Sequence, residues 1–76
     1  MHAALFFHII DGQEFPDLEG TELVDDAAAK REAILAAVSM LREDIGANFW
    51  RGQVWTMRVE NVTGSRVCEL RFSGTG

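Results

Sequence analysis

One long helical pattern, covering residues 27–45, restricts the fold of this chain more than any other feature. Its alanine content gives a high intrinsic helix propensity, and Asp25 and Asp26 directly before it are good N-cap residues. Gly46 directly after it is a typical C-terminal stop. The apolar side chains that share one stripe, and that we expect to be buried, are Ala27, Ile34, Val38, Leu41 and Ile45, with Ala37 on the flank.

Four other segments carry strand patterns. Residues 5–10 are rich in aromatic and β-branched side chains, and residues 21–24 form a shorter segment that can pair back on them. Residues 54–60 and 67–72 alternate between apolar and polar side chains around a predicted turn at residues 61–65. We expect an inward set of Trp55, Met57, Val59, Cys68, Leu70 and Phe72, and an outward set that includes Val67, Glu69 and Arg71.

The predicted element order is β-β-α-β-β in a single domain spanning residues 1–76. Its simplest architecture is an α+β fold, in which one α-helix packs on one face of a small antiparallel sheet. The first strand is apolar on both sides, with Leu5, Phe7 and Ile9 on one side and Phe6, His8 and Ile10 on the other. A single helix covers only one face, so the second face is predicted to be an apolar interface.

A core this small usually needs an additional source of stability. Cys68 is the only cysteine, so no disulfide can form within the chain, which fits a reducing compartment. Two histidines and one cysteine give no pair of close-spaced zinc-ligand doublets. A partner subunit is the remaining addition, and we therefore expect a homodimer.

The charge of the chain is distributed unevenly. Residues 1–26 contain seven acidic residues and no Lys or Arg, whereas the rest of the chain contains seven basic and five acidic residues. An acidic front end disfavours binding to a phosphate backbone. Arg58 and Arg71 are expected to share an outward face with Glu60 and Glu69, which gives a mixed face. We therefore expect no nucleic-acid partner.

Residues 3–10 are apolar except for His8, but this run is short for a signal sequence and has no basic residue before it. No apolar run in the sequence approaches the length that spans a membrane. We expect a cytoplasmic protein that has no membrane partner.

Residues 12–20 are predicted to form an acidic loop around Pro16. Its carboxylates could bind a hard cation such as Ca²⁺. The spacing departs from the calcium-loop pattern, however, because Leu18 lies between Asp17 and Glu19 and no third ligand precedes the glycine. A solvated loop is the expectation.

Two side chains could carry chemistry. His8 could be a metal ligand or a pH-sensitive group, but a histidine on a buried strand is more often packed and bonded to a neighbour. Cys68 is at an inward strand position, which is typical of a structural thiol. The sequence contains no phosphate-binding loop, dinucleotide fingerprint, nucleophile elbow or Cys-x-x-Cys pair. We therefore predict no catalytic residue, no metal and no cofactor.

Trp50 and Trp55 lie around the connection between the helix and the next strand, beside Phe49. Tryptophan is enriched in binding hot spots and is also a common way to close a small core, and both interpretations stay open. The full set of interface candidates is Phe6, His8, Ile10, Trp50 and Trp55.

Several short motifs coincide along the chain: residues 6–8, residues 11–12, the acidic segment 19–23 and the alanine-rich segment 27–33. Together with the closing strand-turn-strand pattern, they resemble a family of short bacterial proteins, frequent in rhizobia and related alphaproteobacteria, that is known as a domain of unknown function. The resemblance implies a bacterial origin and a compact α+β fold. It implies no activity, cofactor or catalytic residue.

The leading hypothesis is a small non-enzymatic interaction or regulatory protein that self-associates through its apolar sheet face. A second hypothesis is an acidic adaptor or antitoxin-like partner of another macromolecule, whose binding would weaken as salt rises. A third is a metal-binding or enzymatic protein that uses His8. Solution mass, salt dependence and metal content separate the three.

Overall fold

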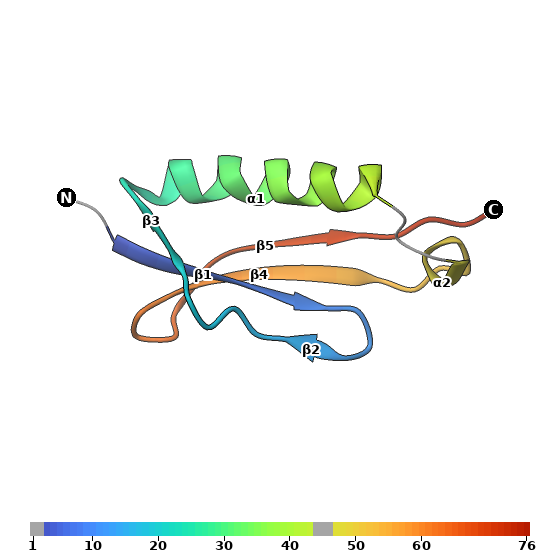
Figure 1. The fold of residues 1–76 in the computed structure, drawn as a ribbon, viewed down its shortest axis with the longest axis horizontal. Helices are drawn as coiled ribbons and strands as arrows, with labels where there is room; N and C mark the ends of the chain where they lie inside the picture. Colours follow the sequence, from blue (N-terminus) through green and yellow to red (C-terminus); the bar gives the residue numbers. More distant parts are fainter. Residues whose placement is uncertain (1–2, 44–46) are drawn as a thin grey trace.

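The computed structural model describes residues 3–43 and 47–76. One long helix lies along one face of a five-stranded antiparallel sheet, and a short helix lies near one end of the molecule (Figure 1). In chain order the elements are β1 (Ala3–Ile10), β2 (Glu14–Phe15), β3 (Thr21–Leu23), α1 (Asp26–Arg42), α2 (Ala47–Trp50), β4 (Trp55–Asn61) and β5 (Arg66–Phe72). This arrangement confirms the predicted α+β fold, and it adds two short elements, β2 and α2, to the predicted order β-β-α-β-β.

The sheet has the order β2-β1-β4-β5, and β3 also pairs with β1. β2 pairs with Ile9 and Ile10, whereas β3 pairs with Ala3, Ala4 and Leu5, so the two short strands share the edge of β1 that faces away from β4. β5 pairs with β4 and forms the opposite edge. The two edges of the sheet are therefore built differently, one from two short strands and one from a single seven-residue strand.

The core lies between α1 and the sheet. Met57 and Val59 of β4 are the largest fully buried side chains, and they pack with Leu5, Ala29 and Ala33. The inward positions predicted for β4 and β5 are confirmed, because Cys68 and Leu70 also pack against this cluster. The period-two alternation therefore identified the correct side of both strands.

The prediction of which side of α1 faces the core is wrong. The buried helix residues are alanines, namely Ala28, Ala29, Ala33 and Ala37. Ile34, Val38 and Leu41, which we expected in the core, are 56%, 46% and 46% exposed, and Ala27 is exposed as well. Short alanine side chains can bring the helix close to the sheet, which leaves the longer apolar stripe outside. The predictions for Ile45 and Gly46 concern positions outside the described residues.

Asp25 begins α1 as its N-cap, as predicted, because its Oδ1 accepts a hydrogen bond of 2.8 Å from the N–H of Ala28. At the other end, the N–H of Glu43 donates to the carbonyl of Ser39. Within the described part of the chain, neither helix has the length and apolarity needed to cross a bilayer.

The turn predicted at residues 61–65 is confirmed. The side chain of Asn61 accepts hydrogen bonds from the backbone N–H groups of Thr63 and Ser65 and closes the β4–β5 hairpin. Val67 was predicted to face outward, but it packs against the core. The reason is a β-bulge, at which the pairing register of β4 and β5 shifts. Val59 pairs with Cys68 and Glu60 pairs with Arg66, so Val67 is the extra residue between them.

Candidate functional site

Three predicted interface candidates lie on the face of the sheet that α1 leaves uncovered. Phe6, His8 and Ile10 alternate along β1 with the residues that face the helix, and all three are half-buried. The rings of Phe6 and His8 stack with centroids 6.5 Å apart and planes 9° apart. We call the surface formed by Phe6, His8, Arg58 and Glu60 the polar face, because charged side chains surround the two rings.

His8 uses both ring nitrogens in contacts within the fold. Its Nδ1 accepts a hydrogen bond of 3.1 Å from the backbone N–H of Asp17, and its Nε2 lies 3.2 Å from Oε1 of Glu60. An accepting Nδ1 carries no proton, so the geometry assigns the neutral ring's proton to Nε2, which donates to Glu60. The side chain of His8 therefore joins the acidic loop to β4. Among residues 3–43 and 47–76, no group of three His, Cys, Asp or Glu side chains could hold a metal ion.

Ion pairs cover much of the outer face of the hairpin. Arg58 lies 3.1 Å from Oε1 of Glu14 through its NH2 group, and its Nε makes a 3.0 Å ionic contact with Oε2 of Glu60. Arg71 lies 3.0 Å from Oε2 of Glu69. The mixed charge expected on this face is present, and it leaves the polar face poorly suited to a dry contact with another protein.

Asp17 closes a gap in the sheet that sequence reasoning missed. Its Oδ1 accepts from the N–H groups of Glu19 and Gly20, and its Oδ2 accepts from the N–H of Phe7, each at 3.1 Å. The N–H of Gly20, followed by those of Phe7 and Glu19, lowers the pKa of Asp17, while burial opposes the shift.

Phe7 lies between the part of β1 that pairs with β3 and the part that pairs with β2, so the Asp17 carboxylate replaces a strand partner there. The residues at 12–20 are therefore more than the solvated loop that we expected. The only local signal was the spacing Asp17-x-x-Gly20, which is typical of a side chain that bonds its own turn.

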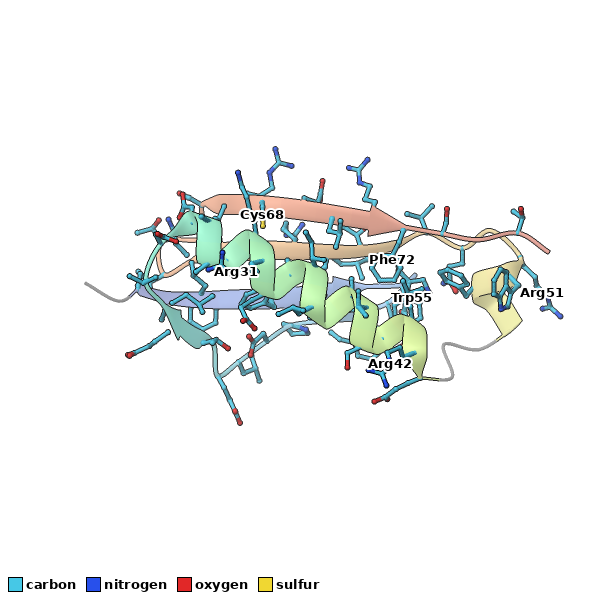
Figure 2. All side chains as sticks on the ribbon, turned by 90° about the horizontal axis from the view of Figure 1, so that it is seen from above. Arg31, Arg42, Arg51, Trp55, Cys68 and Phe72 are labelled. Atoms are coloured by element: carbon cyan, nitrogen blue, oxygen red, sulfur yellow. The ribbon has the colours of Figure 1, made fainter. Side chains whose placement is uncertain are left out.

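The two tryptophans lie away from the polar face. Trp55 stacks on Phe72, with centroids 6.2 Å apart, and Figure 2 shows both side chains beside the second half of α1. Its Nε1 is buried and has no hydrogen-bond partner among the described residues. Trp50 is 56% exposed and packs edge-on against the buried ring of Phe49. The structure thus places one tryptophan against the inner layer and leaves the other on the surface.

Cys68 lines a shallow groove between α1 and β5, together with Lys30, Ala33, Ile34, Glu69 and Leu70. Burial raises the pKa of its thiol, an effect that the nearby Lys30 ammonium opposes. The thiol therefore stays protonated at neutral pH, which agrees with a structural role rather than that of a nucleophile. The walls of the groove are mainly apolar, and Lys30 and Glu69 are its two charged lining residues.

The groove borders the one long free edge of the sheet. Within residues 3–43 and 47–76, no strand pairs with the outer side of β5, which runs along one margin of the sheet in Figure 2. We call this surface the β5–α1 edge. It is formed by the groove residues Ile34 and Leu70, by Val38 one helical turn after Ile34, and by the strand residues Glu69 and Arg71. It combines unpaired backbone groups, exposed aliphatic side chains and two opposite charges.

Residues 5–73 match the family model of DUF6894, a domain of unknown function. The chain belongs to the DUF6894 family. The match confirms the family resemblance inferred from the short motifs of the sequence. It spans the polar face and the β5–α1 edge, so both surfaces belong to the DUF6894 domain. No curated protein and no solved structure matches the chain.

In this DUF6894 domain the five predicted interface candidates do not form one patch. Phe6, His8 and Ile10 lie on the uncovered face of the sheet, Trp55 points to the helix side, and Trp50 belongs to α2. The exposed stripe of α1 and the free edge of β5 were both absent from the prediction. A signal for the stripe was in the sequence, since Ile34, Val38 and Leu41 share one side of a helix, but it was assigned to the core.

Proposed function

We propose that this DUF6894 domain is a non-enzymatic interaction protein that self-associates, with a second copy docking on the β5–α1 edge. The observation that supports the proposal most strongly is the free side of β5 beside the exposed Ile34. An unpaired edge strand offers a row of N–H and C=O groups to another strand. An adjacent aliphatic side chain gains free energy when docking removes it from water.

A second copy is favoured over an unrelated partner because the charges of β5 complement themselves. Glu69 and Arg71 carry opposite charges two residues apart on the same face of the strand. When two copies of such a strand run antiparallel, the acidic position of one can lie opposite the basic position of the other. An isologous contact of this kind needs only one surface, which is repeated by two-fold symmetry.

The polar face supports self-association less well than the β5–α1 edge. Docking there would bury Glu60 and Arg58, which already pair with each other, and would remove both charges from water. Phe6 and His8 are also half-buried by the fold itself. We therefore move the proposed interface from the sheet face to the edge of the sheet.

The proposed location is the cytoplasm. The chain has one cysteine, Cys68, and holds its core together without a disulfide. That composition suits a reducing compartment. The proposal for self-association does not depend on this location.

The test measures solution mass by light scattering from about 1 μM to about 1 mM, a range that covers weak and moderate dimers. Ile34→Glu and Leu35→Glu form a matched pair, because both side chains are 56% exposed but only Ile34 lines the groove beside β5. We expect a dimer for the wild-type chain, a dissociation constant raised at least about tenfold by Ile34→Glu, and no change for Leu35→Glu.

A wild-type chain that stays monomeric over the whole range would overturn the proposal. Equal weakening by both helix variants would also contradict it, because the contact would then not be specific to the side of α1 that faces β5. If Phe6→Glu abolished the dimer and Ile34→Glu did not, the sheet face would be the interface and the proposed edge would be wrong.

A further inference from the structure

We infer that two copies of this domain pair through β5, antiparallel, in the register that places Leu70 directly opposite the partner's Leu70. The inference rests on the proposed self-association and adds its geometry. It makes one continuous sheet from two chains, with β4 and β5 of one copy followed by β5 and β4 of the other. Each possible register brings different side chains of the two β5 strands together.

The first step is the symmetry of the pairing. Directly opposite residues of an antiparallel pair point to the same face of the sheet. Two identical antiparallel strands that keep their faces aligned are therefore related by a two-fold axis that passes midway between one residue and the same residue of the partner. That residue is the centre of the register. For β5 the possible centres near its middle are Cys68, Glu69, Leu70 and Arg71.

The second step is the charge on the outer face. A centre at Glu69 places that carboxylate against the partner's Glu69, and a centre at Arg71 places two guanidinium groups together, and both arrangements are destabilising. A centre at Leu70 instead places Glu69 opposite the partner's Arg71, twice by symmetry. Arg71 has a side chain that is 68% exposed, so it can turn toward the other copy.

The third step excludes the remaining centre. A register centred on Cys68 would place Glu69 opposite the partner's Val67. Val67 is the extra residue of the β-bulge and packs toward the core, so regular pairing is interrupted there. Only the centre at Leu70 uses the regular part of β5 and gives opposite charges across the contact.

The same register explains the position of the exposed helix stripe. The axis runs perpendicular to the sheet, so both α1 helices lie on one side of the joined sheet. Leu70 lines the groove that contains Ile34, and the axis at Leu70 brings the grooves of the two copies together. Ile34, which is 56% exposed in the single chain, is then covered by the second copy. The polar face stays in solvent on the other side.

Charge exchange tests the register. Glu69→Arg alone and Arg71→Glu alone each place like charges across the contact, and each should raise the dimer dissociation constant about tenfold or more. An equimolar mixture of the two variants should form a heterodimer of near wild-type affinity, because every cross-strand pair is then opposite in sign. Centres at Glu69 or Arg71 predict that at least one single variant dimerises as the wild type does, and that result would overturn the register.

Disulfide trapping gives a second measurement. Opposite residues of an antiparallel pair have Cα atoms about 4.5–5.5 Å apart, which a disulfide can span. Leu70→Cys in a Cys68→Ser background should therefore cross-link on mild oxidation. The native Cys68 of the unaltered chain should not, because the partner's Cys68 lies four residues away, roughly 13 Å along the strand.

The two proposals fail in different ways. A wild-type chain without any dimer overturns both the self-association and the register. A dimer that Ile34→Glu weakens, but that cross-links through native Cys68 or is unaffected by at least one of the two single charge variants, overturns the register and leaves the self-association standing. Circular dichroism of each variant confirms that the chain is folded before its mass is interpreted.

Discussion

The two edges of the sheet differ in whether their outer backbone N–H and C=O groups have partners. The β1 edge is divided between β2 and β3, strands of two and three residues, and the gap between them is closed by Asp17. The β5 edge is a single strand of seven residues with no strand on its outer side among those described. Short strands and side-chain substitutes are common ways to prevent an edge from pairing with another chain. One edge is therefore protected and the other is available.

The charges strengthen this difference. Acidic residues without basic ones characterise the first 26 residues, which include β2, β3 and their connections. Two copies of the β1 edge would repel each other, whereas β5 carries both Glu69 and Arg71. A sheet with only one edge suited to self-pairing closes as a dimer and cannot extend into a filament.

The largest effect is expected from removing the closure of the β1 edge. Asp17→Ala leaves the N–H groups of Phe7, Glu19 and Gly20 without their acceptor. Because these bonds go to a charged carboxylate, we expect the free energy of unfolding to fall by about 3 kcal/mol. Urea denaturation followed by circular dichroism measures the change. A loss below about 1 kcal/mol would show that the edge doesn't depend on this side chain.

Asp17→Asn is the matched control, because it keeps one acceptor oxygen and removes the charge. The folded-state pKa of Asp17 lies below its ordinary value of 3.8, so its stabilising effect is fully present above that value. The effect is lost as pH falls through the lower, folded-state pKa. The stability difference between the wild-type chain and Asp17→Asn should therefore shrink in acid, and a constant difference would contradict this role.

A smaller effect is expected from Gly20, which lies at φ = +76° where the acidic loop rejoins β3. A Cβ atom there would lie 2.9 Å from Cε1 of Phe6 and 3.2 Å from the carbonyl oxygen of Leu5. Gly20→Ala should cost about 2 kcal/mol in thermal or urea unfolding.

Gly64→Ala is the comparison for this prediction. Gly64 has a similar φ of +82°, but no atom lies within 4 Å of its added Cβ. Only the backbone strain remains, and we expect a loss of about 1 kcal/mol. Equal losses at the two glycines would mean that Phe6 and the Leu5 carbonyl give no steric resistance to a Cβ atom at position 20.

The smallest effect is expected on the open edge. Glu69 pairs with Arg66 and Arg71, two side chains that are 62% and 68% exposed. Ion pairs with such exposed basic partners contribute little, although the Glu69 side chain itself is only 19% exposed, so Glu69→Gln should change the unfolding free energy of the single chain by no more than about 0.5 kcal/mol. Urea denaturation at low protein concentration, where dimers dissociate, measures this value. A loss above about 1 kcal/mol would show that side-chain interactions stabilise the fold at both edges, and the contrast between them would fail.

The parts of the fold that were predicted from sequence are those whose pattern is local and repeated. The alternation of β4 and β5 identified Met57, Val59, Cys68 and Leu70 as inward residues. Asp25 was identified as a cap from its position before an alanine-rich segment. In each case the residue type and the spacing lead to the same structure without information about distant contacts.

The parts that were not predicted depend on contacts between distant segments. Asp17 matters because Phe7, ten residues earlier, lacks a strand partner on the side of β1 that faces away from β4, and nothing near Asp17 reveals that. The buried side of α1 was misassigned because side-chain size suggested Ile34 and Val38, whereas the distance to the sheet suits Ala29 and Ala33. Two candidate stripes on one helix cannot be distinguished by period alone.

The alanine face of α1 has a consequence for side-chain entropy. Alanine has no rotamers to lose, so Ala28, Ala29, Ala33 and Ala37 become buried without the cost of fixing a χ angle. The same positions filled with leucine would bury more area, but each would give up about 0.5–1 kcal/mol of rotamer freedom. A chain of 76 residues has a small core, so a helix face that is buried without loss of side-chain entropy favours the folded state.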